Sequence, residues 1–258
     1  MKSYKRIPFL VFVVPVFAVI AATATLHETS QKKSTPTSEI EVDEEQWPLA
    51  NFDAPELVEP EKRAKRRARS ARFDQNYYVR EPAPPESGVI YETIIINDWE
   101  VGLSALPADR SDVVVIGEIT DAQAHLSNDK TGVYSEFTVR IGEVLKNDEY
   151  SQLSIGSSVT AERQGGRVRF PSHRILPVRV QGQGMPRTKG RYVLFLKRLS
   201  PGESYHILTG YELCAGRVFA LDGVKNSGGS KWKFDTYEGS DEINFIKNVR
   251  QTIANISL

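Results

Sequence analysis

The stretch VYSEFTVRIGEVLK, residues 133–146, alternates apolar and polar side chains over much of its length. Phe137, Val139 and Ile141 fall on one face of an extended chain, and polar residues stand between them. Alternation with a period of two is typical of a strand that is buried on one face. Gly142 interrupts the pattern, and a glycine inside a long strand often marks a bulge or a sharp bend. The stretch therefore predicts a long, bent β-strand.

Further short strands are predicted on both sides of this one. Val113–Ile116 is a β-branched run that fits a strand buried on both faces. Gly165-Gly166 predicts a hairpin turn, and residues 89–99 predict an edge strand or a covering segment. The remaining predicted strands are 158–163, 167–170, 192–196, 205–209 and 217–221. Strands of this number and spacing favour a sandwich or a small barrel.

The chain ends in a segment with helical periodicity. Ser240 is a plausible N-cap, and Asp241 and Glu242 stand in the first turn. One apolar stripe follows at helical spacing and comprises Phe245, Ile246, Val249, Ile253 and Ile256. We therefore expect one amphipathic C-terminal helix that packs on the barrel.

The order of these features resembles the netrin-like, tissue-inhibitor-of-metalloprotease-like branch of the OB-fold superfamily, over roughly residues 112–222. The long strand ends in Val144-Leu145-Lys146, Gly156 precedes the next strand, and Gly190–Phe195 leads into another. The resemblance implies a small, closed or partly open five-stranded barrel with exposed loops. Those modules carry paired cysteines, whereas this chain has only Cys214. Protease inhibition through an N-terminal cysteine is therefore not implied, and the fold alone leaves the function open.

The N-terminus has the order of charges and apolar residues that marks a membrane-targeting helix. Three basic residues within the first six positions precede the apolar run Ile7–Ala22. Ala22-Thr23-Ala24 offers a cleavage site, whereas the run extended to Leu26 is long enough to span a bilayer. Residues 1–26 are thus a signal peptide or a signal anchor, and the positive flank places the rest of the chain outside the cytoplasm.

Residues 27–88 lack any periodic apolar pattern and are predicted to be a disordered, charged linker to a domain at 89–258. Acidic residues gather between positions 39 and 61, and basic residues gather between 62 and 72. A basic run of this kind can bind anionic lipid, nucleic acid or a glycan, or can be a protease processing site. Alternatively, the two blocks neutralise each other in a solvated linker.

Charge gives the sharpest local signal in the predicted domain. The whole chain has 33 basic and 33 acidic residues, so no net field attracts nucleic acid. Between Arg163 and Arg198, however, there are ten basic residues and no acidic one. Alternate residues such as Arg167 and Arg169 share one face of a strand. The candidate polyanion-binding residues are Arg163, Arg167, Arg169, Arg174, Arg187 and Lys189.

Two interpretations of this basic region remain open. Outside the cytoplasm nucleic acid is an unlikely partner, so the anion would be a glycan or a lipid phosphate. Alternatively, carboxylates on neighbouring strands balance the basic side chains and no partner is needed. The carboxylates considered for this role are Glu118, Glu136, Glu143 and Glu162.

No motif in the chain predicts catalysis, a cofactor or a metal. A thiol enzyme would depend on Cys214 with His206 or His173 as its base, but no known signature surrounds this cysteine. The loop 181–186 lacks the glycines of a nucleotide-binding motif and is expected to be a flexible connection with Met185 exposed. Asp121, Asn128 and Asp129 do not have the spacing of a calcium loop, and a turn is expected there.

The sequence thus predicts an exported or membrane-anchored protein that contacts the membrane through its N-terminal segment. Its β-barrel domain is expected to be a non-catalytic binding or interaction module for a protein or a polyanion. A thiol-dependent enzyme using Cys214 and a purely structural envelope protein are the alternatives.

Overall fold

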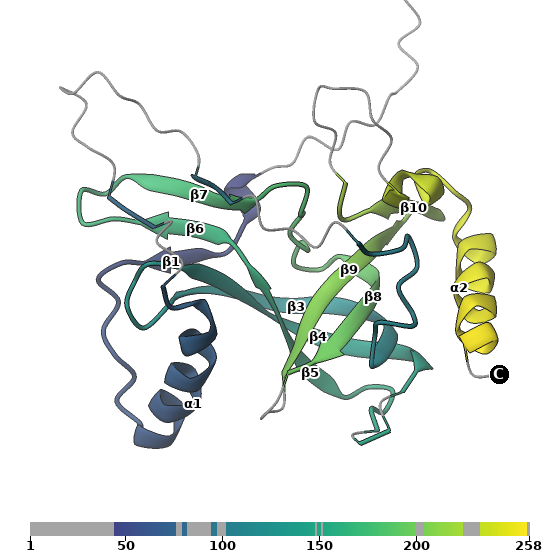
Figure 1. Cartoon of the computed structure of the whole chain (residues 1–258), viewed down its shortest axis with the longest axis horizontal. Helices are drawn as coiled ribbons and strands as arrows, with labels where there is room; N and C mark the ends of the chain where they lie inside the picture. The colour runs from purple at the N-terminus through teal and green to yellow at the C-terminus, as the bar shows by residue number, and fades with distance from the viewer. Residues whose placement is uncertain are drawn as a thin grey trace, which may run out of the picture. The chain divides into compact units, whose positions relative to one another are not determined.

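The computed structural model describes the residues in the ranges 44–75, 79–81, 94–96, 102–147, 149–150, 152–199, 204–223 and 233–256 (Figure 1). The predicted targeting helix at 1–26 lies outside these ranges. Within the described ranges, no helix combines the length and the apolar character needed to cross a bilayer.

The larger sheet has six strands in the order β10-β9-β5-β4-β3-β8, and β9 also pairs with β8. Its strands are β3 (Val113–Leu126), β4 (Val133–Lys146), β5 (Ser158–Gln164), β8 (Arg191–Arg198), β9 (Ser204–Cys214) and β10 (Arg217–Ala220). The parallel pairing of β5 with β9 spans only three residue pairs. The sheet is therefore barrel-like but not closed along its length, and the prediction of a mainly β, barrel-like fold is confirmed.

Strand β4 owes its shape to the alternation seen in the sequence. Phe137, Val139 and Ile141 are all buried in the core enclosed by the sheet. The pairing with β3 passes from Ile116 opposite Glu143 to Gly117 opposite Ile141, which leaves Gly142 without a partner residue. The predicted irregularity at Gly142 is thus a β-bulge, which bends the strand and increases its twist.

The C-terminal helix covers a second core on the outside of the barrel. Helix α2 (Glu242–Ile256) follows the short helix η4 (Lys233–Tyr237) and buries Phe245 and Val249. Asp241 caps the helix, because its side chain accepts a hydrogen bond of 3.0 Å from the backbone N–H of Asn244. The predicted amphipathic helix is therefore confirmed, with the cap one residue later than expected.

A second sheet, which we call the arm sheet, has the strand order β1-β6-β7-β2. Its strands are β1 (Leu49–Asn51), β6 (Gly166–Arg169), β7 (Ile175–Val180) and β2 (Ile94–Ile96). The prediction of a hairpin turn at Gly165-Gly166 is wrong, because β5 and β6 belong to different sheets. The two glycines instead lead the chain from one sheet into the other, while the predicted extra strand within 89–99 is present as β2.

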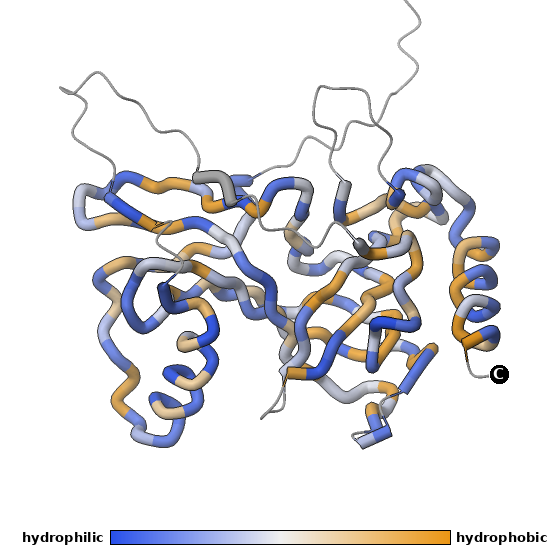
Figure 2. Tube along the Cα trace, viewed as in Figure 1, coloured by the Kyte–Doolittle hydropathy of each residue, from blue (hydrophilic) through white to orange (hydrophobic). Residues whose placement is uncertain are grey.

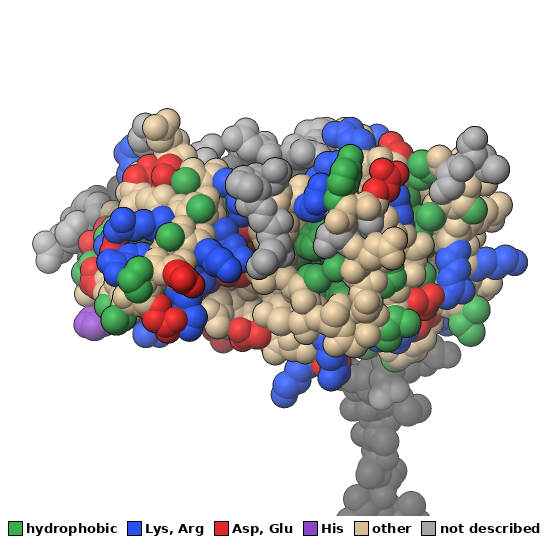
Figure 3. Space-filling model, turned by 90° about the horizontal axis from the view of Figure 1, so that it is seen from below, with side chains coloured by type: hydrophobic (Ala, Val, Ile, Leu, Met, Phe, Trp, Pro, Cys, Tyr) green, Lys and Arg blue, Asp and Glu red, His purple; other side chains and the backbone are tan. Residues whose placement is uncertain are grey.

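The charged stretch 44–75 is ordered, so the prediction of a disordered linker is wrong for these residues. It forms the short helix η1 (Glu44–Gln46), strand β1, helix α1 (Pro60–Ser70) and the short helix η2 (Ala71–Phe73). Trp47 is buried in the barrel core. Helix α1 is hydrophilic over most of its length (Figure 2), and Lys and Arg side chains lie beside Asp and Glu side chains at this end of the domain (Figure 3).

Candidate functional site

The arm sheet separates apolar and basic side chains onto opposite faces. On β6, Val168 is completely buried, Arg167 is half-buried and Arg169 is exposed. On the inner face, Val168 and Val178 belong to a third hydrophobic core, separate from the two described above. Because successive residues of a strand point to opposite faces, Arg167 and Arg169 share the outer face, as the alternation predicts.

The chain before β1 helps to shape this outer face. The Nε of Arg167 donates a hydrogen bond of 2.9 Å to the carbonyl oxygen of Trp47, which fixes the guanidinium against the segment that precedes β1. Arg179 of β7 forms an ion pair with Glu44 and lies 5.9 Å from the centre of the Trp47 ring. In the described part of the chain, Arg169 has no carboxylate within ion-pair distance. The outer face is therefore basic, with one guanidinium held in place and one open to solvent.

Arg174 lies close to these residues in sequence but occupies the turn between β6 and β7. Its backbone oxygen accepts a hydrogen bond of 2.9 Å from the N–H of Phe170. His173 in the same turn is exposed and has a positive φ of 64°. Arg174 is half-buried, and because it lies between the end of β6 and the start of β7 it stands at the tip of the arm rather than on the flat face of the sheet.

Arg163 does not belong to any surface, which corrects its place among the predicted polyanion-binding residues. Its side chain is completely buried, and its guanidinium forms an ion pair with the equally buried Asp222. It also donates hydrogen bonds to the carbonyl oxygens of Gly184 and Leu208, at 2.6 and 3.2 Å. A buried arginine with these partners stabilises the core and is inaccessible to a ligand.

Arg187 and Lys189 lie in the connection before β8 and not on the arm sheet. Arg187 is bound to Glu212 at 2.5 Å, and this hydrogen bond raises the pKa of the arginine. Lys189 is exposed, and its backbone N–H bonds to the carbonyl oxygen of Ile119 in β3. The structure therefore places the six predicted residues in three separate regions: the core, the arm sheet with its turn, and the connection before β8.

The four carboxylates considered as balancing charges pair with other arginines. Glu118 binds Arg140 at 2.5 Å, and Glu143 binds Arg250 of α2 at 2.5 Å. Glu136 and Glu162 bind arginines from the segment 66–72. Charge balance within the chain is therefore extensive, but these four residues do not supply it to the arm sheet.

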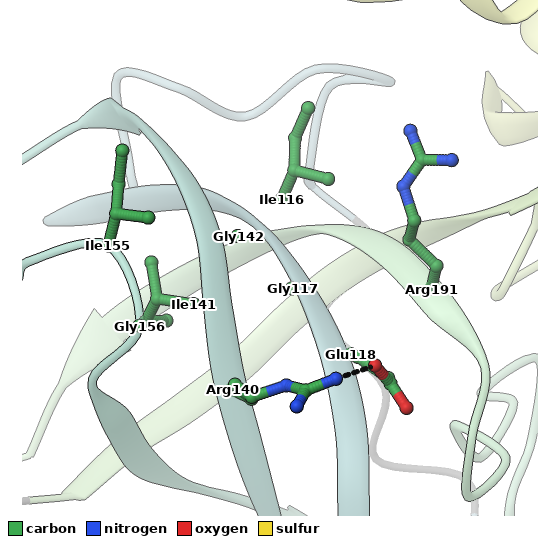
Figure 4. Close-up of a pocket in the computed structure, with 9 residues that line it drawn as sticks. All are labelled: Ile116, Gly117, Glu118, Arg140, Ile141, Gly142, Ile155, Gly156 and Arg191. Carbon is green, nitrogen blue, oxygen red and sulfur yellow. Dashed lines mark hydrogen bonds and ion pairs between the residues drawn. The ribbon is translucent and has the colours of Figure 1, made fainter.

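A hollow of about 270 Å³ lies on the barrel where β3 and β4 bring two glycines together (Figure 4). Its lining comprises Ile116, Gly117, Glu118, Arg140, Ile141, Gly142, Ile155, Gly156 and Arg191. Arg140 is turned toward Glu118, and Arg191 is bonded to Glu242 of α2. Both guanidinium groups already have a carboxylate partner, so an anion would have to displace an ion pair in order to bind them.

The geometry around Cys214 does not form a nucleophile with a base. The thiol is exposed at the end of β9. His206 stands eight positions earlier in the same strand, which at about 3.3 Å per residue places it roughly 26 Å away. His173 lies at the tip of the arm, in the turn after β6.

The described residues also contain no group of three or more His, Cys, Asp or Glu side chains that could hold a metal ion. Asp129 uses its carboxylate within a turn, where it accepts hydrogen bonds from Ser127, Thr131 and the backbone of Gln75. The hydrogen bond from Ser127 is the main cause that holds the pKa of Asp129 well below its usual range. The expected turn is therefore present.

The glycine-rich loop before β8 is packed, not flexible. Met185 is only 6% exposed and belongs to the barrel core, so the prediction that it is exposed is wrong. The N–H of Gly184 bonds to Asp222 at 2.9 Å, and a Cβ atom at this glycine would lie 2.0 Å from the carbonyl oxygen of Leu221. The glycine thus permits a close approach of two backbone segments.

Comparison with known protein families found no family model that matches the sequence, and comparison with curated proteins found no match. The sequence pattern identified Arg167 and Arg169 on one face, but it missed the contributions of Trp47 and Glu44. Both residues precede β1 in a segment whose composition resembles that of a linker. The apolar Trp47 within that acidic stretch was the one signal that could have revealed it.

Proposed function

We propose that this chain is a non-catalytic binding protein whose barrel-like domain lies outside the cytoplasm and uses the arm sheet to bind an anionic partner. Five strands paired in a ring, with one short junction, fit the five-stranded, partly open barrel that the OB-fold resemblance implies. The location rests on the basic residues that precede the apolar run Ile7–Ala22.

The observation that carries the proposal is the placement of Arg167 and Arg169 on the outer face of β6. The hydrogen bond from Arg167 to Trp47 uses Nε, which leaves the two terminal nitrogens of this guanidinium for a ligand. A planar guanidinium matches the oxygens of a sulfate or phosphate group, and it forms paired hydrogen bonds with them. The chemistry of the ligand is therefore that of a sulfated glycan or a phosphate-bearing lipid headgroup.

The test compares the full chain with two double variants on immobilised heparin, eluted by a salt gradient. Arg167→Ala with Arg169→Ala should elute at clearly lower salt than the unmodified chain, because two contacts with the anion are lost. The matched control, Lys65→Ala with Arg110→Ala, removes the same charge from two exposed positions elsewhere. The control should elute with the unmodified chain.

Sedimentation with vesicles that contain an anionic phospholipid separates the two sources of the anion. Loss of vesicle binding in the arm variant, with heparin retention unchanged, would assign the site to lipid headgroups, and the reverse result would assign it to a glycan. Equal shifts for the arm variant and the control in both assays would show that only total charge matters and would refute the site.

A further inference from the structure

Helix α1 docks on the barrel without an apolar face. After Pro60 at its first position, its sequence, PEKRAKRRARS, contains no apolar side chain larger than alanine. An ordinary surface helix presents an apolar stripe to the core, and a helix that is polar all round needs other contacts to stay in place. The contacts that hold α1 therefore lie in its charged and polar side chains.

Three arginines, spaced three residues apart, make these contacts. Arg66 and Arg69 reach the same oxygen of Glu136, at 3.4 and 3.3 Å. Arg72, in η2 just after the helix, binds Glu162 at 2.5 Å. Each of the three guanidinium groups is partly buried, so the arginines fill the interface that an apolar stripe would otherwise occupy.

The barrel side of this interface is acidic, because two neighbouring strands each contribute a glutamate to it. Glu136 of β4 and Glu162 of β5 stand directly opposite each other, an arrangement that is unfavourable for two like charges. Glu162 is only 1% exposed, and burial raises its pKa even though the hydrogen bond from Arg72 acts to lower it. Together with His125 and Tyr134 these residues form what we call the acidic recess. Two carboxylates in such a recess require cationic partners.

The acidic recess has more acceptor capacity than α1 uses. One oxygen of Glu136 and one oxygen of Glu162 are buried without a hydrogen-bond partner among the described residues. The Nε2 of His125, also unpaired there, is a donor, because Nδ1 of this ring accepts a hydrogen bond from Arg66. Buried polar atoms are nearly always paired. Burial, followed by the charges of Arg66 and Arg69, lowers the pKa of His125 to about 3, so the imidazole is neutral. The recess can therefore accept further donors.

Uncharged contacts give the recess a shape as well as a charge. The hydroxyl of Tyr134 lies 3.1 Å from Oγ of Ser70, and Phe73 stacks on the Tyr134 ring with centroids 4.4 Å apart. The side chain of Asn128 donates a hydrogen bond of 3.0 Å to the carbonyl oxygen of Arg67. The recess thus fits a helix that carries arginines at intervals of three and ends in an aromatic residue.

Helix α1 is attached weakly enough for another segment to displace it. The helix has 11 residues, and isolated helices shorter than about 12 to 15 residues are marginal in water. The arginine side chains at the interface keep 23 to 28% of their surface exposed, so water and salt screen the ion pairs.

We propose that the acidic recess is a docking site for an arginine-rich helical segment of a partner protein, and that α1 occupies this site until such a segment displaces it. The surface and the partner both differ from those of the arm sheet, so the two proposals stand independently. The occupant seen in the structure defines the chemistry of the partner: guanidinium groups spaced along one helical face.

The test uses a fluorescent synthetic peptide of residues 59–75 as the probe and follows its anisotropy on the full chain at low salt. Arg66→Ala, Arg69→Ala and Arg72→Ala together empty the recess, and this opened variant should bind the peptide at least tenfold more tightly than the unmodified chain. Adding Glu136→Gln and Glu162→Gln to the opened variant should weaken binding at least tenfold.

The matched control is Arg63→Ala with Lys65→Ala and Arg67→Ala, which removes the same charge from α1 without touching the recess carboxylates. This variant should bind the peptide as weakly as the unmodified chain. Equal binding by the opened variant and this control, or binding that ignores the two Glu→Gln changes, would overturn the proposal.

Hydrogen exchange of the unmodified chain provides a second measurement that does not depend on the opened variant folding. An excess of isotope-labelled peptide should speed amide exchange in the chain's own residues 60–70, and an unchanged rate would refute displacement. Self-association of the unmodified chain that Glu136→Gln and Glu162→Gln abolish would show that a second copy supplies the helix, and this result would overturn the assignment to a different protein.

Discussion

Replacing Arg163 by methionine should destabilise the domain strongly, because it would leave Asp222 as a buried, unpaired charge. Both side chains are completely buried, and the guanidinium donates to the two oxygens of Asp222 at 2.8 and 2.6 Å. It also reaches the carbonyl oxygens of Gly184 and Leu208. The pair thereby joins β5 and β9 to the loop before β8 and to the segment after β10.

Breaking a buried ion pair by removing one partner costs about 3 to 5 kcal/mol. The double variant Arg163→Met with Asp222→Asn should recover about 2 kcal/mol of this loss, because the remaining amide is neutral and can still accept the N–H of Gly184. Urea unfolding at neutral pH, followed by circular dichroism, measures both values. With a slope of about 2 kcal/mol per molar urea, the single variant should lower the midpoint by roughly 2 M.

Two results would refute this reasoning. A loss below about 1 kcal/mol in the single variant would show that Asp222 does not remain charged and buried without its partner. A double variant no more stable than the single one would show that packing around the arginine, and not the unpaired charge, causes the loss.

Three further predictions concern single residues. Burial, followed by the charge of Arg163, lowers the pKa of His206 from 6.5 to about 4. Between these two pH values the folded state binds fewer protons than the unfolded state. The free energy of unfolding should therefore fall as the pH drops through this window, by up to about 1.4 kcal/mol per pH unit. His206→Gln should flatten this slope in urea titrations at pH 7 and pH 5, and an equal slope in both proteins would contradict it. Gly184→Ala should lower the free energy of unfolding, measured by thermal unfolding, by more than about 3 kcal/mol, because the new Cβ would collide with Leu221. Gly216→Ala, where a Cβ has open space but the backbone φ is 74°, should lower it by about 1 to 2 kcal/mol. Cys214 is exposed, so a thiol reagent should label it in the folded protein about as fast as in denaturant; strong protection would contradict this exposure.

The sequence predicts best those elements whose buried face is formed by neighbouring residues. The alternation of Phe137, Val139 and Ile141 identified β4, and the stripe containing Phe245 and Val249 identified α2. In both cases the periodic apolar side chains alone determine which face is buried. Gly142 likewise predicted an irregularity, because a glycine in a strand interior usually has a structural cause.

Elements held by distant charges could not be predicted in this way. Helix α1 has no apolar stripe, and its partners Glu136 and Glu162 lie more than sixty positions later in the chain. Arg163 belongs to an alternating basic pattern that predicts exposure, yet its partner Asp222 brings it into the core. Such pairings cannot be recognised from the local sequence, so α1 was assigned to a linker and Arg163 to a surface.

Strand β7 was missed for a different reason. Pro177 stands in its middle, and a proline usually excludes a central strand because it cannot donate a hydrogen bond. Here it stands opposite Arg167 of β6, while β2 pairs with the other edge from Val178 to Val180. The candidate anion site was therefore predicted in part: the pair on β6 followed from alternation, but the sheet around it did not.

The most direct test of the proposed function is the salt dependence of the affinity of the full chain for heparin. The logarithm of the affinity should fall linearly with the logarithm of the salt concentration, and for nucleic acids each contact contributes about 0.7 to 0.9 to that slope. Arg167→Ala with Arg169→Ala should therefore reduce the slope by roughly 1.5, whereas the control Lys65→Ala with Arg110→Ala should leave it unchanged. An arm variant that keeps the heparin affinity and slope of the unmodified chain, and also its binding to anionic vesicles, would contradict the proposal that the arm sheet binds anions.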